Sequence, residues 1–364
     1  MKILIGMPSK DSWGGPIASE PPFVGALRDL GVSVTEEVYV FGDKGEPTPF
    51  FRRIQRVIGT AFNLRCVLKS DDFDLIHFNT SFDKKTILRD SLSLFFLGTK
   101  RPKVFFKFHG SGAEELVNTS FLYRKLIEYI KKRVDGYGVF SSEEMSNFRQ
   151  IGFDQNKLFF VKNAITIGAE PAEDRARPTQ YETPRILFVS RFIPTKGLIE
   201  TIQACAIIRD LKFNFVLTCV GDGETARPAK REVERLHLTD QVEFTGYISE
   251  DEVARHYFES DIFVFPTRHI EGFPIVLFKA VAAGLPIVTT NIRAAKDYLA
   301  ENENCLFSTQ DPANIAEKLA RLIEDKPLRE SMSEKNIDLG KTLLPDKIAE
   351  EYLAIYEKIC ARSS

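Results

Sequence analysis

The chain has 364 residues, more than one hydrophobic core usually supports, and its length predicts about two domains. With 43% hydrophobic and 27% charged residues, its composition is typical of globular proteins and excludes fibrous and disordered classes. No apolar run reaches the roughly 18 residues of a membrane-spanning helix, and five cysteines without a C-x-x-C pair argue against a disulfide framework or a metal site. We expect a cytoplasmic protein.

The net charge of −2 hides an asymmetry between the two halves of the chain. Residues 1–165 hold 24 Lys and Arg against 19 Asp and Glu, whereas residues 166–364 hold 25 against 32. A basic first half is compatible with an anionic partner such as a membrane lipid headgroup or a lipid-linked phosphate, and equally with a solvated surface. A nucleic-acid partner is not expected.

Strand-like apolar runs alternate with amphipathic helical stretches along the chain, as in parallel sheets built from βαβ units. In the first half the predicted strands are 2–7, 33–41, 74–79, 104–109, 136–141 and 158–163, with helices such as 22–30 and 119–133 between them. Residues 165–184 contain three prolines and no apolar period, which predicts a linker. The second series has strands at 185–190, 213–221, 242–246, 261–266 and 286–290.

The two series predict an α/β protein with two Rossmann-like domains. The first domain covers residues 1–165, the linker 166–184 and the second domain 185–340. The final segment, 341–364, contains a helical apolar stripe between 347 and 359, and we expect that it can pack back on the first domain. Ligands of doubly wound sheets lie at the carboxyl ends of the strands, so two such domains in tandem imply a binding cleft.

The stretch 50–69 has two interpretations. Its apolar residues at positions 50, 51, 54, 57, 58, 61 and 62 lie opposite Arg52, Arg53, Arg56 and Asn63. This pattern is compatible with an interfacial helix that reaches anionic lipid. A helix that buries its apolar stripe against the sheet is the favoured interpretation, because crossover helices routinely have the same pattern.

Two short motifs have the chemistry of ligand binding. Gly14 and Gly15 follow the first strand and precede a helix; a diphosphate could approach the backbone there, although a flexible turn explains a glycine pair equally well. Arg191 and Lys196 follow strand 185–190 and also precede a helix. Two cations at such a position can neutralise the two phosphates of a nucleotide diphosphate during bond cleavage.

The stretch 265–280 combines a loop with the start of a helix. Glu271 stands beside Gly272 and Phe273, and helical periodicity begins at Ile275. Exposed backbone amides at a helix start readily hold polar ligand groups, so this loop is a candidate ligand-binding wall. Lys279 lies on the helix, eight residues after Glu271.

Taken in order, the motifs resemble those of the retaining glycosyltransferases of family four. They are the Gly-Gly pair at 14–15, R-x-x-x-x-K-G at 191–197, V-G-D-G at 220–223, F-x-G-x-I at 244–248, P-T-x-x-x-E-G-F-P at 266–274 and A-x-A-A-G-x-P at 280–286. The resemblance spans nearly the whole chain and is most specific in the second half. It implies the GT-B fold, in which two doubly wound Rossmann-like domains face each other across a cleft.

The resemblance implies a role for each matching residue. Arg191 and Lys196 would hold the diphosphate of the donor without an obligatory metal or other cofactor. Glu271 would contact hydroxyls of the transferred sugar, and His109, at the end of strand 104–109, would lie beside its reacting face. Further donor contacts would come from Gly14, Gly15, Tyr247, Ile248, Gly272 and Phe273.

Lys279 departs from the family pattern, which usually has a second glutamate at this position that binds the ribose hydroxyls of the nucleotide. A carboxylate accepts from two hydroxyls, whereas an ammonium group only donates. Lys279 could contact ribose oxygens or a phosphate, the nucleotide could be held mainly by its base and diphosphate, or transfer activity could be lost. In a fourth interpretation, Lys279 points away and nothing depends on it.

The resemblance therefore implies a retaining, metal-independent hexosyltransferase. Its partners would be a nucleotide-diphosphate sugar as donor and a glycan or lipid-linked acceptor hydroxyl, as in polysaccharide synthesis, with a candidate peripheral contact to an anionic membrane. An alternative from another class is a non-catalytic protein that binds sugar nucleotides or glycans. An epimerase on the same fold would transform the donor without an acceptor.

Overall fold

The computed structural model describes residues 1–364 except 10–14, 40–49, 99–100, 113–119, 169–182 and 363–364. Its contacts divide the chain into two compact units. The first consists of Met1–Ala164, Glu271–Phe273 and Leu344–Ser364, and the second of Ile165–Ile270 and Pro274–Leu343. Most of the predicted linker lies outside the described residues, and so does Gly14.

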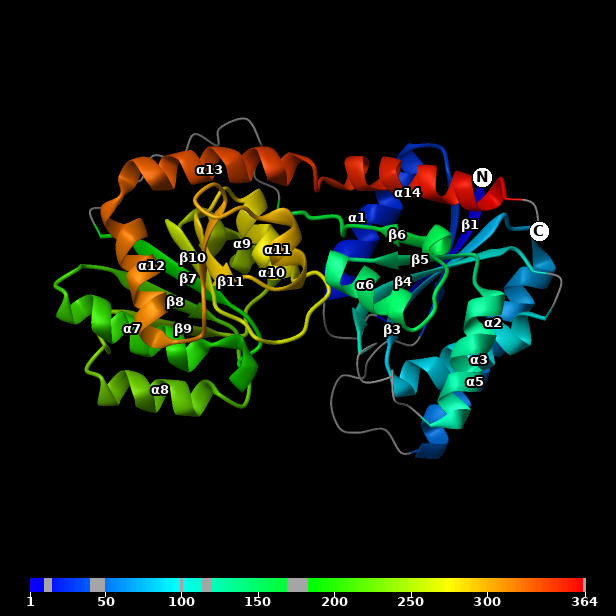
Figure 1. Cartoon of the computed structure of the whole chain (residues 1–364), viewed down its shortest axis with the longest axis horizontal. Coiled ribbons are helices and arrows are strands. Elements are labelled where there is room, and N and C mark those ends of the chain that lie inside the picture. The colour runs from blue at the N-terminus through cyan, green and yellow to red at the C-terminus, as the bar shows by residue number, and fades with distance from the viewer. Residues whose placement is uncertain (10–14, 40–49, 99–100, 113–119, 169–182, 363–364) are drawn as a thin grey trace. The chain divides into compact units, whose positions relative to one another are not determined.

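The first unit contains a six-stranded parallel sheet in the order β2-β1-β3-β4-β5-β6 (Figure 1). The four inner strands of the sheet are mostly buried, as expected for a parallel sheet that is covered on both faces, whereas the edge strands β2 and β6 are more exposed. The strands are β1 (Lys2–Met7), β2 (Ser33–Val38), β3 (Leu75–Phe82), β4 (Lys103–Ser111), β5 (Gly136–Val139) and β6 (Leu158–Phe160).

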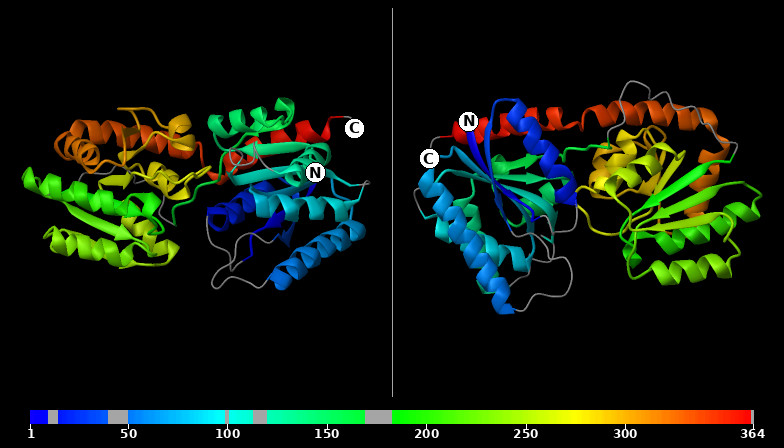
Figure 2. Two further views of the ribbon diagram at one scale, coloured as in Figure 1. Left: turned by 60° about the horizontal axis from the view of Figure 1, so that its bottom comes forward. Right: turned by 180° about the vertical axis from the view of Figure 1, so that it is seen from behind.

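Helices cover both faces of this sheet (Figure 2). On one face, α1 packs beside the C-terminal helix α14. The other face carries α2, α3, α5 and α6, and their buried residues join those of the sheet in one apolar cluster. The bounds are α1 (Gly15–Asp29), α2 (Phe50–Ser70), α3 (Lys84–Leu97), α5 (Phe121–Arg133), α6 (Ser142–Gln150), the short helix η1 (Gln155–Lys157) and α14 (Pro345–Cys360).

The second unit contains another six-stranded parallel sheet, in the order β12-β11-β10-β7-β8-β9. The sequence patterns predict five of these strands and miss β12, a four-residue strand next to β11 at the sheet edge. The strands are β7 (Arg185–Val189), β8 (Val216–Val220), β9 (Val242–Gly246), β10 (Ile262–Phe265), β11 (Ile287–Thr290) and β12 (Cys305–Ser308).

The helices of the second unit also divide between the two faces of its sheet (Figures 1 and 2). Helices α7, α8 and α12 share one apolar core with the sheet, whereas α9, α10 and α11 lie on the opposite face. The bounds are η3 (Pro194–Lys196), α7 (Leu198–Asp210), α8 (Ala226–Arg235), α9 (Glu250–Phe258), α10 (Ile275–Ala282), α11 (Arg293–Tyr298), α12 (Pro312–Glu324) and α13 (Lys326–Lys341).

Two expectations about the first unit are wrong. Helix α1 begins at Gly15 and not at Pro22, so it contains Pro21 and Pro22 in its interior, and Gly15 is its first residue rather than part of a loop. Helix α2 buries only part of the stripe expected for it, because Phe51, Ile58 and Phe62 are exposed. Ala61 of that stripe is buried, together with Leu64, which lies outside it.

Candidate functional site

The second sheet has a topological switch point between β7 and β10. These strands are neighbours, although the chain runs from β7 toward one edge of the sheet and from β10 toward the other. Ligands of doubly wound sheets bind beside the carboxyl ends of the two strands at such a point. Arg191 lies two residues after the end of β7, and the loop 266–274 follows β10, so the fold places the motifs around the expected binding position.

Backbone contacts fix the loop that carries Arg191. The neighbouring Phe192 is buried, and its amide donates to the carbonyl of Asp222 at 2.9 Å. Gly221 approaches the same loop so closely that a Cβ atom there would lie 1.9 Å from the carbonyl oxygen of Ser190. The V-G-D-G motif thus supports the backbone on both sides of Arg191, whose own side chain is exposed.

Lys196 is the last residue of the short helix η3, and only 3% of its surface is exposed. Its ammonium group lies 5.1 Å from the centre of the Phe265 ring at the end of β10. Gly197 follows with φ of 82°, in the left-handed region, and a Cβ atom there would lie 2.7 Å from the carbonyl oxygen of Pro266. This close approach joins the loop after β7 to the loop after β10.

Thr195 holds three of the loops at this edge together. Its carbonyl oxygen accepts hydrogen bonds from the Arg268 amide at 2.9 Å, the Gln310 side chain at 3.1 Å and the Thr267 hydroxyl at 3.4 Å. Its hydroxyl lies 3.1 Å from Nδ1 of His269. The loops after β7, β10 and β12 therefore form one connected wall, and the backbone next to Lys196 belongs to it.

The other predicted residues of the β10 loop are placed differently. Glu271, Gly272 and Phe273 group with the first unit by their contacts, whereas Ile270 and Pro274 on either side of them group with the second. Glu271 is half-buried. The role of Glu271 in binding the sugar stays a prediction.

Lys279 has an ion-pair partner that the sequence did not predict. Its ammonium group forms an ion pair with the carboxylate of Glu250, the first residue of α9. The side chain of Lys279 is only 12% exposed, whereas that of Glu250 is 72% exposed. Tyr247, exposed, and Ile248, half-buried, lie in the turn just before α9. A carboxylate is therefore present near the predicted nucleoside-binding turn, on a different helix from the one that the family pattern uses.

We expect Lys279→Glu to lower the free energy of unfolding of the second unit by about 1 kcal/mol, because it sets two carboxylates against each other. The charge-swapped variant Lys279→Glu/Glu250→Lys should recover most of this loss. Urea unfolding of the two variants and the wild type measures both effects. Equal losses in the single and swapped variants would show that the ion pair makes no difference.

The first sheet also has a switch point, between β1 and β3. Gly15 lies after β1, at the start of α1, and His109 lies near the end of β4, which runs two residues further than predicted. His109 is nearly buried, and its Nε2 atom lies 2.7 Å from Oδ1 of Asn79 on β3. Burial lowers the pKa of His109 well below its usual value, and the positive charge of Lys107 lowers it further. His109 is therefore neutral at pH 7.

His77, the second histidine of the first sheet, has a structural position. It is fully buried on β3, and its Nδ1 atom lies 2.7 Å from the hydroxyl of Tyr356 on α14. Its Nε2 atom has no hydrogen-bond partner among the residues that the structure describes. Burial lowers the pKa of His77 well below its usual value, with a further contribution from Lys107.

Because of these lowered pKa values, the first unit should lose stability in mild acid. Below the ordinary histidine pKa of 6.5 the unfolded chain binds protons at His77 and His109 that the folded state does not bind. The free energy of unfolding is then highest above that pH and falls as the pH drops, by up to about 1.4 kcal/mol per pH unit for each histidine. Urea unfolding between pH 7 and pH 5 measures this slope.

A His77→Phe variant should show a shallower slope over the same range, because one of the two histidines is gone. If His77→Phe and the wild type have the same slope, the buried histidine is not responsible.

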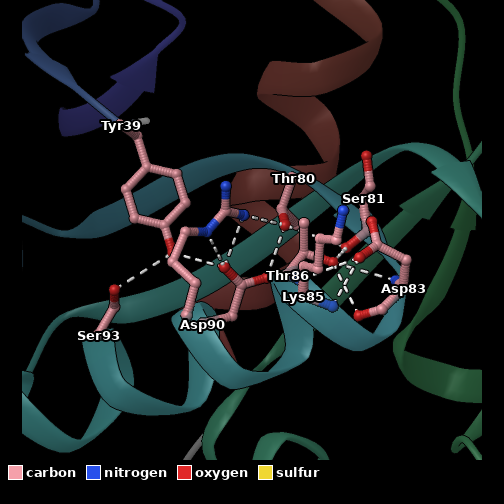
Figure 3. Close-up of polar contacts among 9 residues, drawn as sticks. Tyr39, Thr80, Ser81, Asp83, Lys85, Thr86, Asp90 and Ser93 are labelled. Atoms are coloured by element: carbon pink, nitrogen blue, oxygen red, sulfur yellow. Dashed lines mark hydrogen bonds and ion pairs between the residues drawn. The ribbon is translucent and has the colours of Figure 1, made fainter. Parts of the chain in front are cut away.

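A second polar cluster lies near the carboxyl ends of β2 and β3 in the first sheet (Figure 3). The Asp90 carboxylate of α3 accepts from the hydroxyls of Tyr39 and Thr80, each at 2.6 Å, and from Nε of Arg89 at 2.7 Å. The guanidinium of Arg89 also lies 4.4 Å from the centre of the Tyr39 ring. Asp90 is buried and accepts from all three side chains, so we interpret this cluster as a structural anchor for the chain after β2.

The partners that surround the predicted residues were not predicted from the sequence. One of them, Lys107, had a visible signal, because a lysine within the apolar run of β4 predicts a buried partner of opposite charge. Glu20 on α1 is that partner, at 2.6 Å. Glu20 itself, Asn79 and Glu250 had no signal in the sequence, since each meets its partner across a distance that only the fold closes.

Comparison with known protein families identifies the second half of the chain. Residues 170–338 match the family model described as Glycosyl transferases group 1, so this stretch is a glycosyltransferase group 1 domain.

The chain is also similar to whole glycosyltransferases. It is 23% identical over 327 residues to an uncharacterized glycosyltransferase of Methanocaldococcus jannaschii, covering 85% of this chain and 82% of that protein. It is 25% identical over 364 residues to the N,N'-diacetylbacillosaminyl-diphospho-undecaprenol alpha-1,3-N-acetylgalactosaminyltransferase of Campylobacter jejuni, covering 94% and 90%. A GDP-mannose-dependent phosphatidylinositol monomannoside mannosyltransferase of Mycobacterium tuberculosis is 29% identical over 165 residues, 43% of each chain.

Solved structures confirm the predicted fold. A glycosyltransferase from Rickettsia africae has a TM-score of 0.75 at 16% identity, covering 100% of this chain and 99% of that chain. Anabaena HepE in complex with UDP-glucose has a TM-score of 0.74 at 16% identity, covering 98% and 100%. The two parallel sheets with their flanking helices are those of the GT-B fold.

Proposed function

We propose that the protein is a retaining glycosyltransferase of family four that transfers a hexose from a nucleotide-diphosphate sugar to an acceptor hydroxyl. The observation that carries this proposal is the position of Arg191 and Lys196 beside the switch point of the second sheet. Arg191 lies on a loop and Lys196 at the end of η3, and glycine contacts and hydrogen bonds fix the backbone of both segments. Cations held in place before the reaction stabilise a departing diphosphate without the cost of reorganisation.

In the proposed reaction the bond between the anomeric carbon and the diphosphate oxygen breaks, and the acceptor oxygen bonds to the same face of that carbon. The acceptor proton passes to an oxygen of the leaving phosphate. Arg191 and Lys196 neutralise the charge that develops on the diphosphate, so the reaction does not require a metal ion. Glu271 would hold sugar hydroxyls, and the amides of Gly272 and Phe273 would assist it.

The relatives support the proposed donor and acceptor classes. Structures of Anabaena HepE contain UDP or UDP-glucose, which supports a nucleotide-diphosphate sugar as donor. The Campylobacter jejuni relative transfers to a diphospho-undecaprenol-linked sugar, and a Staphylococcus aureus relative is a capsular polysaccharide glycosyltransferase. We propose a glycan or lipid-linked sugar as acceptor, in the assembly of a polysaccharide or lipid-linked glycan.

A panel of nucleotide sugars tests this function without knowledge of the acceptor. Calorimetry should detect binding of one nucleoside diphosphate, and the matching nucleotide sugar should be hydrolysed slowly when water replaces the acceptor. Binding without any turnover would favour a non-catalytic sugar-nucleotide-binding protein. Conversion of the donor into an isomeric nucleotide sugar would indicate an epimerase.

We also propose a peripheral contact between α2 and an anionic membrane surface, where a lipid-linked acceptor would lie. Phe51, Ile58 and Phe62 are exposed on this helix, together with Arg52 and Arg56, and α2 contains no acidic residue. Exposed apolar and basic side chains on one helix favour binding to anionic lipid. No helix in the described part of the chain is long and apolar enough to span a bilayer.

The triple variant Phe51→Ser/Ile58→Ser/Phe62→Ser should bind vesicles that contain anionic phospholipid about tenfold more weakly than the wild type. Co-sedimentation measures this binding. Leu211→Ser, which removes an exposed apolar side chain from the second unit, is the control and should bind like the wild type. Equal binding of the wild type to neutral and anionic vesicles would contradict the proposal.

A further inference from the structure

An ion pair joins the start of α9 to α10 within the second unit. The ammonium group of Lys279 pairs with Oε2 of Glu250, and the Lys279 side chain is 12% exposed whereas that of Glu250 is 72% exposed. A charge that is so nearly buried needs a partner, and Glu250 supplies it. Among the described residues none donates to Oε1 of Glu250, so this carboxylate is held at one oxygen and keeps the other for a ligand.

Hydrogen bonds on both helices fix the position of this carboxylate. Ser249 and Glu252 form a capping box, in which the Ser249 hydroxyl accepts from the Glu252 amide at 3.3 Å and the Glu252 carboxylate accepts from the Ser249 amide at 2.9 Å. Tyr257, buried on α9, donates from its hydroxyl to the Val276 carbonyl of α10 at 3.0 Å. Because the two helices are fastened together, Glu250 is ordered before any ligand binds.

The turn before α9 is also connected to the loop that carries Arg191. The Gly221 amide donates to the Gly246 carbonyl at 3.0 Å, and the Gly221 backbone touches that of Ser190, next to Arg191. β8 lies between β7 and β9 in the sheet. Neighbouring strands are about 4.8 Å apart, so the ends of β7 and β9 are about 10 Å apart. A nucleotide whose diphosphate lies at Arg191 can therefore reach the start of α9 with its nucleoside.

The chemistry of Glu250 fits one part of such a nucleotide. The two hydroxyls of a ribose are neighbours and can both donate, and a carboxylate accepts from both. Acidic residues bind ribose hydroxyls in this way at the carboxyl edge of other doubly wound sheets. An ammonium group only donates, so Lys279 could not accept from these hydroxyls itself.

We propose that Glu250 binds the ribose hydroxyls of the nucleotide donor and that Lys279 is the positioning residue that holds its carboxylate. This inference rests on the proposed function. Lys279 acts through Glu250 and touches neither ribose nor phosphate, which differs from each role that the sequence suggested for it.

Calorimetry with UDP, GDP, ADP and CDP, each compared with its 2′,3′-dideoxy form, tests the role of Glu250. The wild type should bind the ribose form of the recognised nucleotide about 10- to 100-fold more tightly than the dideoxy form, because hydrogen bonds to a charged acceptor are lost. Glu250→Ala should abolish this preference. An unchanged preference in Glu250→Ala would overturn the proposal.

Asp251→Ala is the matched control. Asp251 is the next residue of α9, is also exposed and lies in the same helical turn, so its removal changes the net charge equally. The preference for ribose should stay as in the wild type. A loss as large as in Glu250→Ala would assign the effect to charge or to damage at the start of α9, and would contradict the proposal.

Variants of Lys279 separate positioning from folding. Lys279→Met keeps the buried stem and removes the ammonium group, so the preference for ribose should fall about three- to tenfold. Lys279→Arg keeps a cation that can pair with Glu250 and should retain most of the preference. Full preference in Lys279→Met would show that the carboxylate does not need the lysine, which would overturn the positioning role.

These outcomes are distinct from those that test sugar transfer. A preference for ribose that depends on Glu250 would stand even if no sugar were transferred, whereas absence of turnover with every nucleotide sugar would count against transfer alone. Failure of the wild type to bind any of the four ribonucleoside diphosphates would overturn this inference together with the proposed donor.

Discussion

Arg191→Ala should slow sugar transfer by about 100- to 1,000-fold, and Lys196→Met should do the same, because each removes a cation fixed beside the leaving diphosphate. Methionine is used at position 196 because the stem of Lys196 is buried and an alanine would leave a cavity. The loss should appear mainly in kcat, since the charge on the leaving group develops in the transition state. Turnover of nucleotide sugar in steady-state assays measures it.

Arg235→Ala provides the control for charge alone. Arg235 is exposed at the end of α8 and pairs with Glu232, so its removal lowers the net charge equally and should leave the rate unchanged. Rates close to wild type in both Arg191→Ala and Lys196→Met would show that the diphosphate is not held at the switch point of the second sheet.

Gly221→Ala should destabilise the second unit by about 3 kcal/mol or more and abolish most activity. Gly221 has φ of 134°, and the new Cβ atom would lie 1.9 Å from the Ser190 carbonyl oxygen and 3.1 Å from the Phe192 ring. Strained backbone and a severe clash are among the few causes of such large losses. Relief of the clash moves the loop that carries Arg191, so activity should fall even in the fraction that folds.

Gly25→Ala is the comparison for this substitution. Gly25 lies within α1, and a Cβ atom there would meet nothing within 4 Å. Alanine should therefore be neutral or stabilise the protein by about 0.5–1 kcal/mol. If Gly221→Ala unfolds at the same urea concentration as the wild type, V-G-D-G does not support the loop as described.

The sequence predicts the sheets well because parallel strands are buried on both faces and appear as short continuous apolar runs. β1 and β9 have the bounds that were expected. Helix α1 was predicted to begin seven residues too late because a proline pair usually opens a helix, whereas here it lies inside one. β12 was missed because Cys305–Ser308 is short and contains only two strongly apolar residues.

The candidate site was predictable to the extent that its residues follow strands. Arg191 and Lys196 could be placed because one strand end and one helix start bracket them. Lys279 shows the limit of this reasoning, since its partner Glu250 lies 29 residues earlier in the chain, on another helix. Contacts of this kind depend on how helices pack, and no local pattern encodes them.

The most direct test of the proposed function is a crystal structure with a bound nucleoside diphosphate. The predicted result places phosphate oxygens within about 3.2 Å of both the Arg191 guanidinium and the Lys196 ammonium group. A nucleotide bound in the crystal with its diphosphate beyond hydrogen-bond reach of both cations would contradict it.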